Sequence, residues 1–121
     1  MSNSNVSVNI FNPGSTQINI AVNNGNVFAI AGASPSQGWQ PQQPSSNPVS
    51  FNYGNPAPNT FGGHGPNQVM VRDDFGNQHV LQIHIPQSGP VISLQLYIFL
   101  SHSGVSWVML NNGQTIGYGN A

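Results

Sequence analysis

The stretch VISLQLYIFL, residues 91–100, determines the fold class. Apolar side chains occupy every even-numbered position from 92 to 100. The alternate positions hold Ser93, Gln95, Tyr97 and Phe99. Successive side chains of a β-strand point to opposite faces, so this period-two pattern predicts a strand with one continuous apolar face. We expect residues 91–100 to form the central strand of the core.

Segments with the same alternation lie along most of the chain. Residues 5–31 contain three of them, separated by Asn12-Pro13-Gly14-Ser15 and Asn23-Asn24-Gly25-Asn26. Turns of this composition, and Asn-Gly above all, predict a three-stranded meander. Core strands are predicted within residues 68–121, at 68–72, 78–85, 91–100, 105–110 and 114–118. No run shows the 3.6-residue period of a helix, so the expected fold is all-β. We expect one domain over residues 1–121, an antiparallel β-sandwich or open barrel of about eight short strands.

Residues 32–67 differ in composition, because seven of the ten prolines fall there among many Ser, Gln, Asn and Gly residues. One short strand is predicted within this segment, at residues 49–53. The rest is expected to be a long Pro/Gln/Asn-rich loop. A loop of this length inside a compact domain is usually functional or disordered. If it is ordered, it must pack on its own sheet or on a neighbouring molecule.

Charge is almost absent from the chain. Only Arg72, Asp73 and Asp74 among the 121 residues are formally charged, whereas about a quarter of an average protein is. One arginine cannot neutralise a phosphate backbone, which argues against nucleic acid as a partner. The absence of cysteine excludes disulfides and thiolate chemistry. Residues 1–5 lack the basic and apolar regions of a cleavable signal, and no stretch is long enough for a transmembrane helix. We expect a location in the cytoplasm, as an inclusion, or export by a route without a signal peptide.

The titratable residues do not form a recognisable catalytic or metal-binding pattern. Asp73 and Asp74 are adjacent, so they point apart in an extended chain and suit a solvated turn better than a catalytic pair. His79 and His84 are separated by an odd offset on one predicted strand, which places them on opposite faces. No G-x-S-x-G elbow is present. We therefore expect no enzyme activity, no catalytic residues, no bound metal and no cofactor.

The two tryptophans lie in different contexts. Trp107 has Val105 and Met109 on the same face of its predicted strand, which favours a place in the core. Trp39 has no apolar neighbours in sequence, so it must dock on something or stay exposed. With Asn52, Tyr53 and Asn55 it could build a site for neutral sugars. Covering the domain's own core and mediating self-association are equally open alternatives.

The lack of charge favours self-association. Soluble β-proteins place charge on edge strands to prevent edge-to-edge pairing, and this chain has almost none to place. Uncharged polar side chains on the first predicted strands suit neutral contacts between copies, and the candidate assembly face consists of Ser7, Asn9, Gln17 and Asn19. The leading hypothesis is a non-enzymatic structural protein whose main partner is itself, assembling into a filament, layer or crystalline inclusion. The first alternative is a lectin-like module that binds neutral glycans. A weaker one is a membrane-acting β toxin, motivated by Tyr97 and Phe99 on a mixed strand face.

Histidine is the only abundant titratable residue type, represented by His64, His79, His84 and His102. Protonation of all four changes the formal charge from −1 to +3. Histidine side chains titrate with a reference pKa near 6.5. We expect any assembly to loosen between about pH 7 and pH 5 as like charge accumulates.

Overall fold

A computed structural model describes residues 7–14, 16–32, 49–85, 91, 93–101 and 104–120 of the chain. These residues form ten β-strands and no helix, so they contain no helix able to cross a membrane. The strands are β1 (Ser7–Phe11), β2 (Ile18–Val22), β3 (Phe28–Ile30), β4 (Val49–Asn52), β5 (Thr60–Gly62), β6 (Asn67–Arg72), β7 (Gln78–Ile83), β8 (Leu94–Ser101), β9 (Gly104–Asn111) and β10 (Gln114–Asn120). The prediction of an all-β fold is confirmed.

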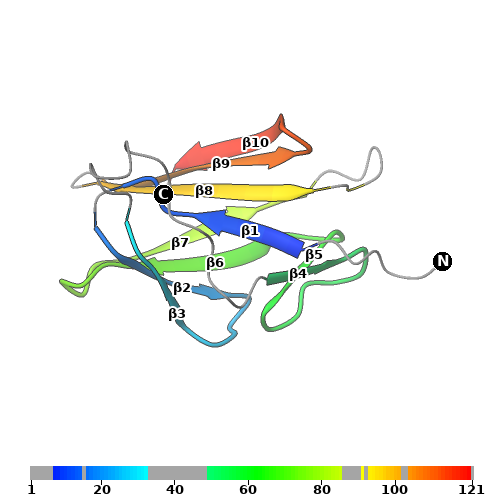
Figure 1. Ribbon diagram of the computed structural model, residues 1–121. Helices are drawn as coiled ribbons and strands as arrows, with labels where there is room; N and C mark the ends of the chain where they lie inside the picture. Colours follow the sequence, from blue (N-terminus) through cyan, green and yellow to red (C-terminus); the bar gives the residue numbers. More distant parts are fainter. Residues whose placement is uncertain are drawn as a thin grey trace.

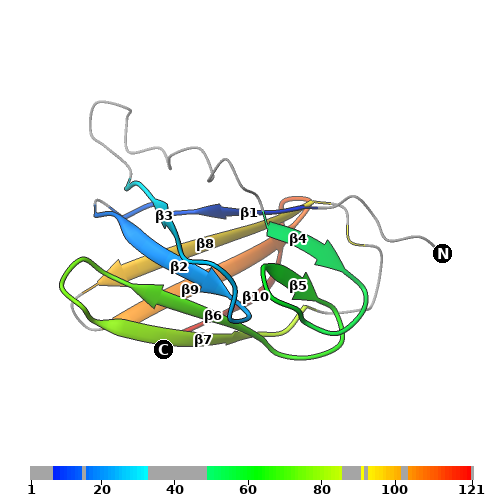
Figure 2. The ribbon, with the colours of Figure 1, turned by 90° about the horizontal axis from the view of Figure 1, so that it is seen from below.

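The strands form two sheets that enclose one hydrophobic core. The larger sheet has the order β10-β9-β8-β1-β4-β5 and the smaller one has the order β3-β2-β6-β7. Figure 1 shows the two layers in side view, and Figure 2 shows the smaller sheet from below. Most neighbouring strands are antiparallel, but β1 runs parallel to β8 and β4 runs parallel to β5. The architecture is a β-sandwich whose larger sheet curls toward the smaller one.

The central strand of the larger sheet is β8, as the alternation in residues 91–100 predicts. It lies between β9 and β1, and it pairs with β9 in continuous register from Leu94 opposite Asn111 to Ser101 opposite Gly104. Leu94, Leu96 and Ile98 are fully buried. The apolar face of this strand therefore forms the middle of the core, and the alternate positions lie on the outside.

The predicted three-stranded meander is wrong in its first strand. β2 and β3 form the expected hairpin, but β1 belongs to the other sheet and pairs with β4 and β8. Between β1 and β2 the chain turns a corner at Asn12, which is buried. Its side-chain amide donates to the carbonyls of Thr16 and Ile30, at 2.6 and 3.1 Å. Alternation specifies which side chains point inward but not which strand lies next, so β1 fits either sheet.

The proline-rich segment contains more regular structure than predicted. The predicted strand at 49–53 is present as β4, and β5 pairs with it in parallel although no strand was predicted there. Residues 33–48, which include Trp39, lie outside the described residues. Trp107 packs against the core as predicted, and a side chain at Gly119 would lie only 2.9 Å from its indole nitrogen. The indole therefore lies close against the backbone of β10, and any larger residue at position 119 would force it to move.

A buried asparagine joins the two sheets where β5 meets β6. The Asn67 side chain accepts a hydrogen bond from the Gly62 N–H at 2.8 Å and donates to the carbonyls of Gly62 and Ile83, at 2.9 and 3.1 Å. Its oxygen also accepts from the Asn23 amide at 3.0 Å, and that amide donates to the Thr60 carbonyl at 2.7 Å. Strands of both sheets thus share one network of uncharged groups.

Candidate functional site

The four residues of the predicted assembly face are divided between the two sheets. Ser7 and Asn9 alternate with buried residues of β1, so they point outward from the larger sheet. Asn19 points outward from β2 of the smaller sheet, and Gln17 is exposed just before that strand. The outer faces of a sandwich lie on opposite sides of the molecule. These residues therefore do not form one continuous surface.

The residues predicted to hold a neutral sugar are largely engaged in the fold. The ring of Tyr53 packs edge-on against Phe51, with ring centroids 5.0 Å apart, and its hydroxyl accepts a hydrogen bond from the Val91 N–H at 3.2 Å. The Asn52 oxygen accepts from the Gly54 N–H at 2.7 Å. Asn55 is exposed, and Trp39 lies outside the described residues. Tyr53 thus anchors the chain beyond β4 and is not a free aromatic platform.

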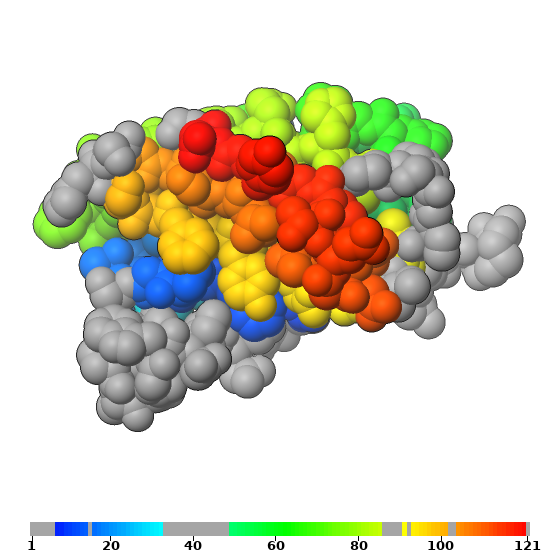
Figure 3. All heavy atoms as spheres, turned by 90° about the horizontal axis from the view of Figure 1, so that it is seen from above, coloured from blue at the N-terminus to red at the C-terminus, as the bar shows by residue number. Residues whose placement is uncertain are grey.

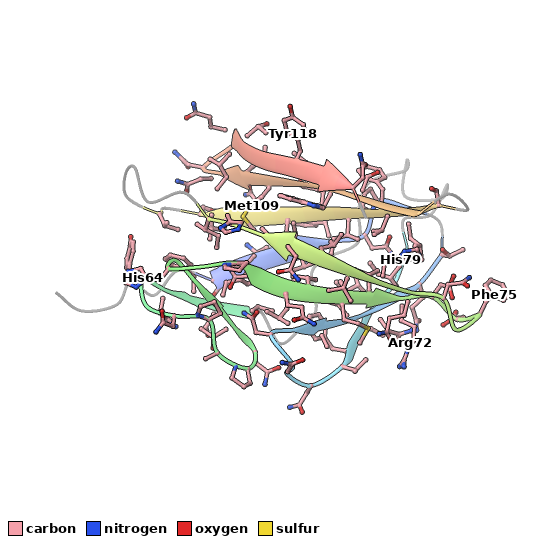
Figure 4. The ribbon with its side chains drawn as sticks, turned by 180° about the vertical axis from the view of Figure 1, so that it is seen from behind. His64, Arg72, Phe75, His79, Met109 and Tyr118 are labelled. Carbon is pink, nitrogen blue, oxygen red and sulfur yellow. The ribbon has the colours of Figure 1, made fainter. Side chains whose placement is uncertain are left out.

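The histidines are dispersed over the molecule. His64 and His84 are exposed, and His79 is partly buried on β7, whereas His102 lies outside the described residues. Figure 4 shows His64 and His79 toward opposite ends of the sandwich. Among the described residues, no group of three or more His, Cys, Asp or Glu side chains is close enough to hold a metal ion.

Both aspartates belong to the turn between β6 and β7, beside a pocket of about 640 Å³ at one end of the sandwich. The Asp73 carboxylate accepts hydrogen bonds from the Asn77 side chain, the Asn77 N–H and the Phe75 N–H, all at 2.9 Å. These bonds, the one from the Asn77 side chain above all, hold the pKa of Asp73 below its usual value. The Asp73 carboxylate therefore stabilises the turn through its hydrogen bonds. Phe75 projects from the same turn into solvent (Figure 4).

Two long strand edges are free of a partner among the described residues. β7 ends the smaller sheet and β10 ends the larger one. β7 pairs with β6 in unbroken register over all its six residues, and it contains neither a proline nor a formally charged residue. β10 is equally uncharged, with one irregularity between Thr115 and Gly117. The backbone donors and acceptors on these outer edges have no strand partner among the described residues.

A row of aromatic and apolar side chains crosses the outer face of the larger sheet. Phe11 of β1 lies opposite Tyr97 of β8, Tyr97 lies opposite Val108 of β9, and Val108 lies opposite Tyr118 of β10. We call these four residues the aromatic row. The rings of Phe11 and Tyr97 are stacked with centroids 4.8 Å apart, and Tyr118 is 80% exposed. Figure 3 shows this face, where the side chains of β8 to β10 gather beside those of β1.

The sequence indicates only part of this row. The pattern of residues 91–100 places Tyr97 and Phe99 outward, but it does not reveal that Phe11 and Tyr118 align with Tyr97. That alignment depends on the register between strands far apart in the chain. The available signal is an apolar residue at a position that alternation assigns to solvent, which holds for Phe11 after Ser7 and Asn9. Tyr118 gives no such signal, because alternation groups it with Ile116, and only the irregularity between Thr115 and Gly117 separates the two.

Comparisons with protein-family models, with curated protein sequences and with solved structures found no match for this chain. Its function therefore has to be inferred from its own surfaces.

Proposed function

We propose that this protein is a non-enzymatic structural subunit that assembles with copies of itself into a filament, layer or crystalline inclusion. Neighbouring copies are joined through their free strand edges. The observation that carries this proposal is the edge of β7, which is six residues long, regular, uncharged and without proline.

An unprotected edge of this kind is unusual. Natural β-proteins blunt their edge strands with lysine, proline, bulges or covering segments, because a bare edge pairs with any other bare edge. Among the described residues, β7 has none of these devices. Its outward-facing side chains include Val80 and Gln82, which can lie beside the same residues of another copy without electrostatic repulsion.

The presence of a second free edge makes extended growth possible. Pairing of β7 with β10 of the next copy is a heterologous contact, which continues into an open filament unless the rotation between copies closes a ring. A filament also grows when β7 pairs with β7 of one neighbouring copy and β10 pairs with β10 of another, because each subunit then contacts two neighbours through two different edges. The irregularity in β10 leaves Gly117 to Asn120 regularly paired with β9, so a straight portion of this edge remains.

The formal net charge of −1 removes the usual barrier to such packing. Net charge far from zero keeps proteins apart through mutual repulsion, and a value near zero promotes association. The three charged residues lie on β6 and the turn after it, so neither free edge carries a formal charge. Contacts between copies then depend on backbone hydrogen bonds and apolar burial, which salt affects little.

The test is the particle size of the purified protein at neutral pH, measured by light scattering, with negative-stain microscopy of the same sample. We expect ordered particles far larger than the 12.8 kDa chain. The variant Val80→Lys places a charge on the edge strand, and it should reduce the particles to dimers at most, since β10 is then the one long uncharged edge left among the described strands. The matched control is Gln68→Lys, which adds the same charge to the exposed face of the same sheet, one strand further in.

A wild-type protein that remains a monomer at high concentration would contradict the proposal. Equal effects of Val80→Lys and Gln68→Lys would show that overall charge, and not the edge of β7, controls association. Circular dichroism and thermal melting of both variants establish that each one keeps the fold.

A further inference from the structure

We propose that the aromatic row and its polar flanks form a binding platform for an uncharged polysaccharide chain. This inference does not depend on the assembly proposed above, because it concerns the outer face of the larger sheet and not its edge. It also differs from the site predicted from sequence, which centred on Trp39 and Tyr53.

The row has the shape of an extended binding site. Its four side chains lie on four consecutive strands, and strands in a sheet are about 4.8 Å apart, so the row extends over roughly 14 Å. That length suits several linked sugar rings, whereas a single ring would use only part of it. Phe99 extends the apolar surface to one side and is 48% exposed.

Aromatic faces and sugar rings are chemically complementary. The face of an aromatic ring carries partial negative charge, while the axial C–H groups of a pyranose ring carry partial positive charge and form an apolar patch. Tyr118 and Phe99 are exposed enough to stack with such patches, whereas Phe11 and Tyr97, whose ring faces cover each other, add apolar ring edges beside them. A linear glycan laid along the row would contact these rings in succession.

Uncharged hydrogen-bonding groups flank the row on both sides. On one side the register places Asn9 of β1 beside Gln95 of β8, and neither side chain has a hydrogen-bond partner among the described residues. On the other side Ser106 donates to the oxygen of Asn120 at 2.8 Å, which leaves the amide nitrogen of Asn120 available. Free amides next to exposed rings are the groups that sugar hydroxyls require.

The charge distribution selects among possible partners. No residue of the aromatic row or its flanks is formally charged, because Arg72, Asp73 and Asp74 all belong to the smaller sheet and its turn. Nucleic acids and anionic lipids need lysine or arginine at their binding surface. A charged partner would gain no electrostatic attraction here and would lose hydration. An uncharged glycan matches the surface, since it brings hydroxyl groups to each free amide.

The experiment measures depletion of the full-length protein from solution by microcrystalline cellulose and by chitin, and its retardation in gels containing xylan, dextran or laminarin. Heparin serves as the anionic comparison. The protein carries Val80→Lys, so that loss of glycan binding can be distinguished from loss of assembly. We expect retention by at least one neutral polysaccharide, and we expect Tyr118→Ala and Phe99→Ala each to weaken it roughly five- to tenfold. The matched control is Phe75→Ala, which removes an exposed aromatic side chain at the turn outside this face and should change nothing.

Three results would overturn the inference. They are the absence of binding to every neutral polysaccharide, binding that survives both alanine substitutions, and stronger binding to heparin than to any neutral probe. A fourth result assigns the face to contacts between copies instead: Tyr118→Ala and Phe99→Ala in the otherwise wild-type chain reduce particle size while no polysaccharide binds. Unchanged thermal melting of the variants shows that the fold is intact in each case.

Discussion

Replacement of Asn67 by alanine should destabilise the fold more than any other single loss of a polar side chain among the described residues. Asn67 of β6 is fully buried, and its amide bonds to groups of β5 and β7 at the junction of the two sheets. The alanine side chain can neither donate nor accept a hydrogen bond, so it replaces none of these contacts. The buried N–H and carbonyl of Gly62 would then lose this side-chain partner, and the Ile83 carbonyl would keep only its bond within the sheet.

The size of the effect follows from these contacts. A buried backbone group that loses its partner costs about 1–3 kcal/mol, and the N–H and the carbonyl of Gly62 both lose the Asn67 amide. Allowing for partial relaxation, we expect the free energy of unfolding to fall by about 3–5 kcal/mol. Domains of ordinary stability unfold with about 5–15 kcal/mol, so the variant would lose a large part of the total. The melting temperature should fall by roughly 10 °C or more.

Urea denaturation followed by tryptophan fluorescence measures this change, with thermal melting as a second readout. Gln68→Ala on the same strand is the control, because that side chain is exposed, and the expected change is within about 0.5 kcal/mol. Asn67→Asp keeps the shape but turns a carboxylate toward the carbonyls of Gly62 and Ile83. Burial there raises the pKa of the new acid, so this variant should lose stability as the pH rises above about 4. A loss below about 1 kcal/mol for Asn67→Ala would refute the role assigned to the network.

Three further predictions concern the turn, one glycine and the histidines. Because the pKa of Asp73 is lowered, its hydrogen bonds stabilise the turn above about pH 3.9 and are lost as the pH falls through the lowered pKa. The NMR chemical shift of the Asn77 amide should therefore change at that pH in the wild-type protein, and it should not change in Asp73→Asn. Gly62→Ala should lower the melting temperature by several degrees, because its Cβ would enter the backbone of the loop before β5, while Gly65→Ala has room and should be neutral by the same assay. Assembled particles should shrink between about pH 7 and pH 5, as the formal charge rises toward +3, and added salt should change them little; constant scattering over that range would contradict this.

The positions of the strands could be predicted because they depend on local alternation. The core strand at residues 91–100 and the turn at Asn23-Asn24-Gly25-Asn26 are examples, since Asn23 and Asn24 adopt the left-handed backbone that asparagine allows. The partners of the strands could not be predicted in the same way. β1 joins the larger sheet because Asn12 turns the chain there, and β5 has only three residues among prolines and glycines. The aromatic row has the same dependence, because it exists only once Phe11 and Tyr118 align with Tyr97.

The asparagines inside the fold have a structural role, and that role does not explain why charge is absent from the surface. Inside the fold, the side chains of Asn12, Asn23 and Asn67 bond to backbone groups at turns and strand ends, and they do so without a buried charge. An amide suits this because it both donates and accepts. Nothing in that internal role prevents lysine or glutamate on the outer faces, where most substitutions change stability by less than about 0.5 kcal/mol.

The neutrality of the outer surface therefore needs a cause of its own. Edge-to-edge assembly and binding of an uncharged glycan both require a neutral surface, and they require it at different places. Lysine substitutions on β7 test the first requirement, and alanine substitutions of Tyr118 and Phe99 test the second.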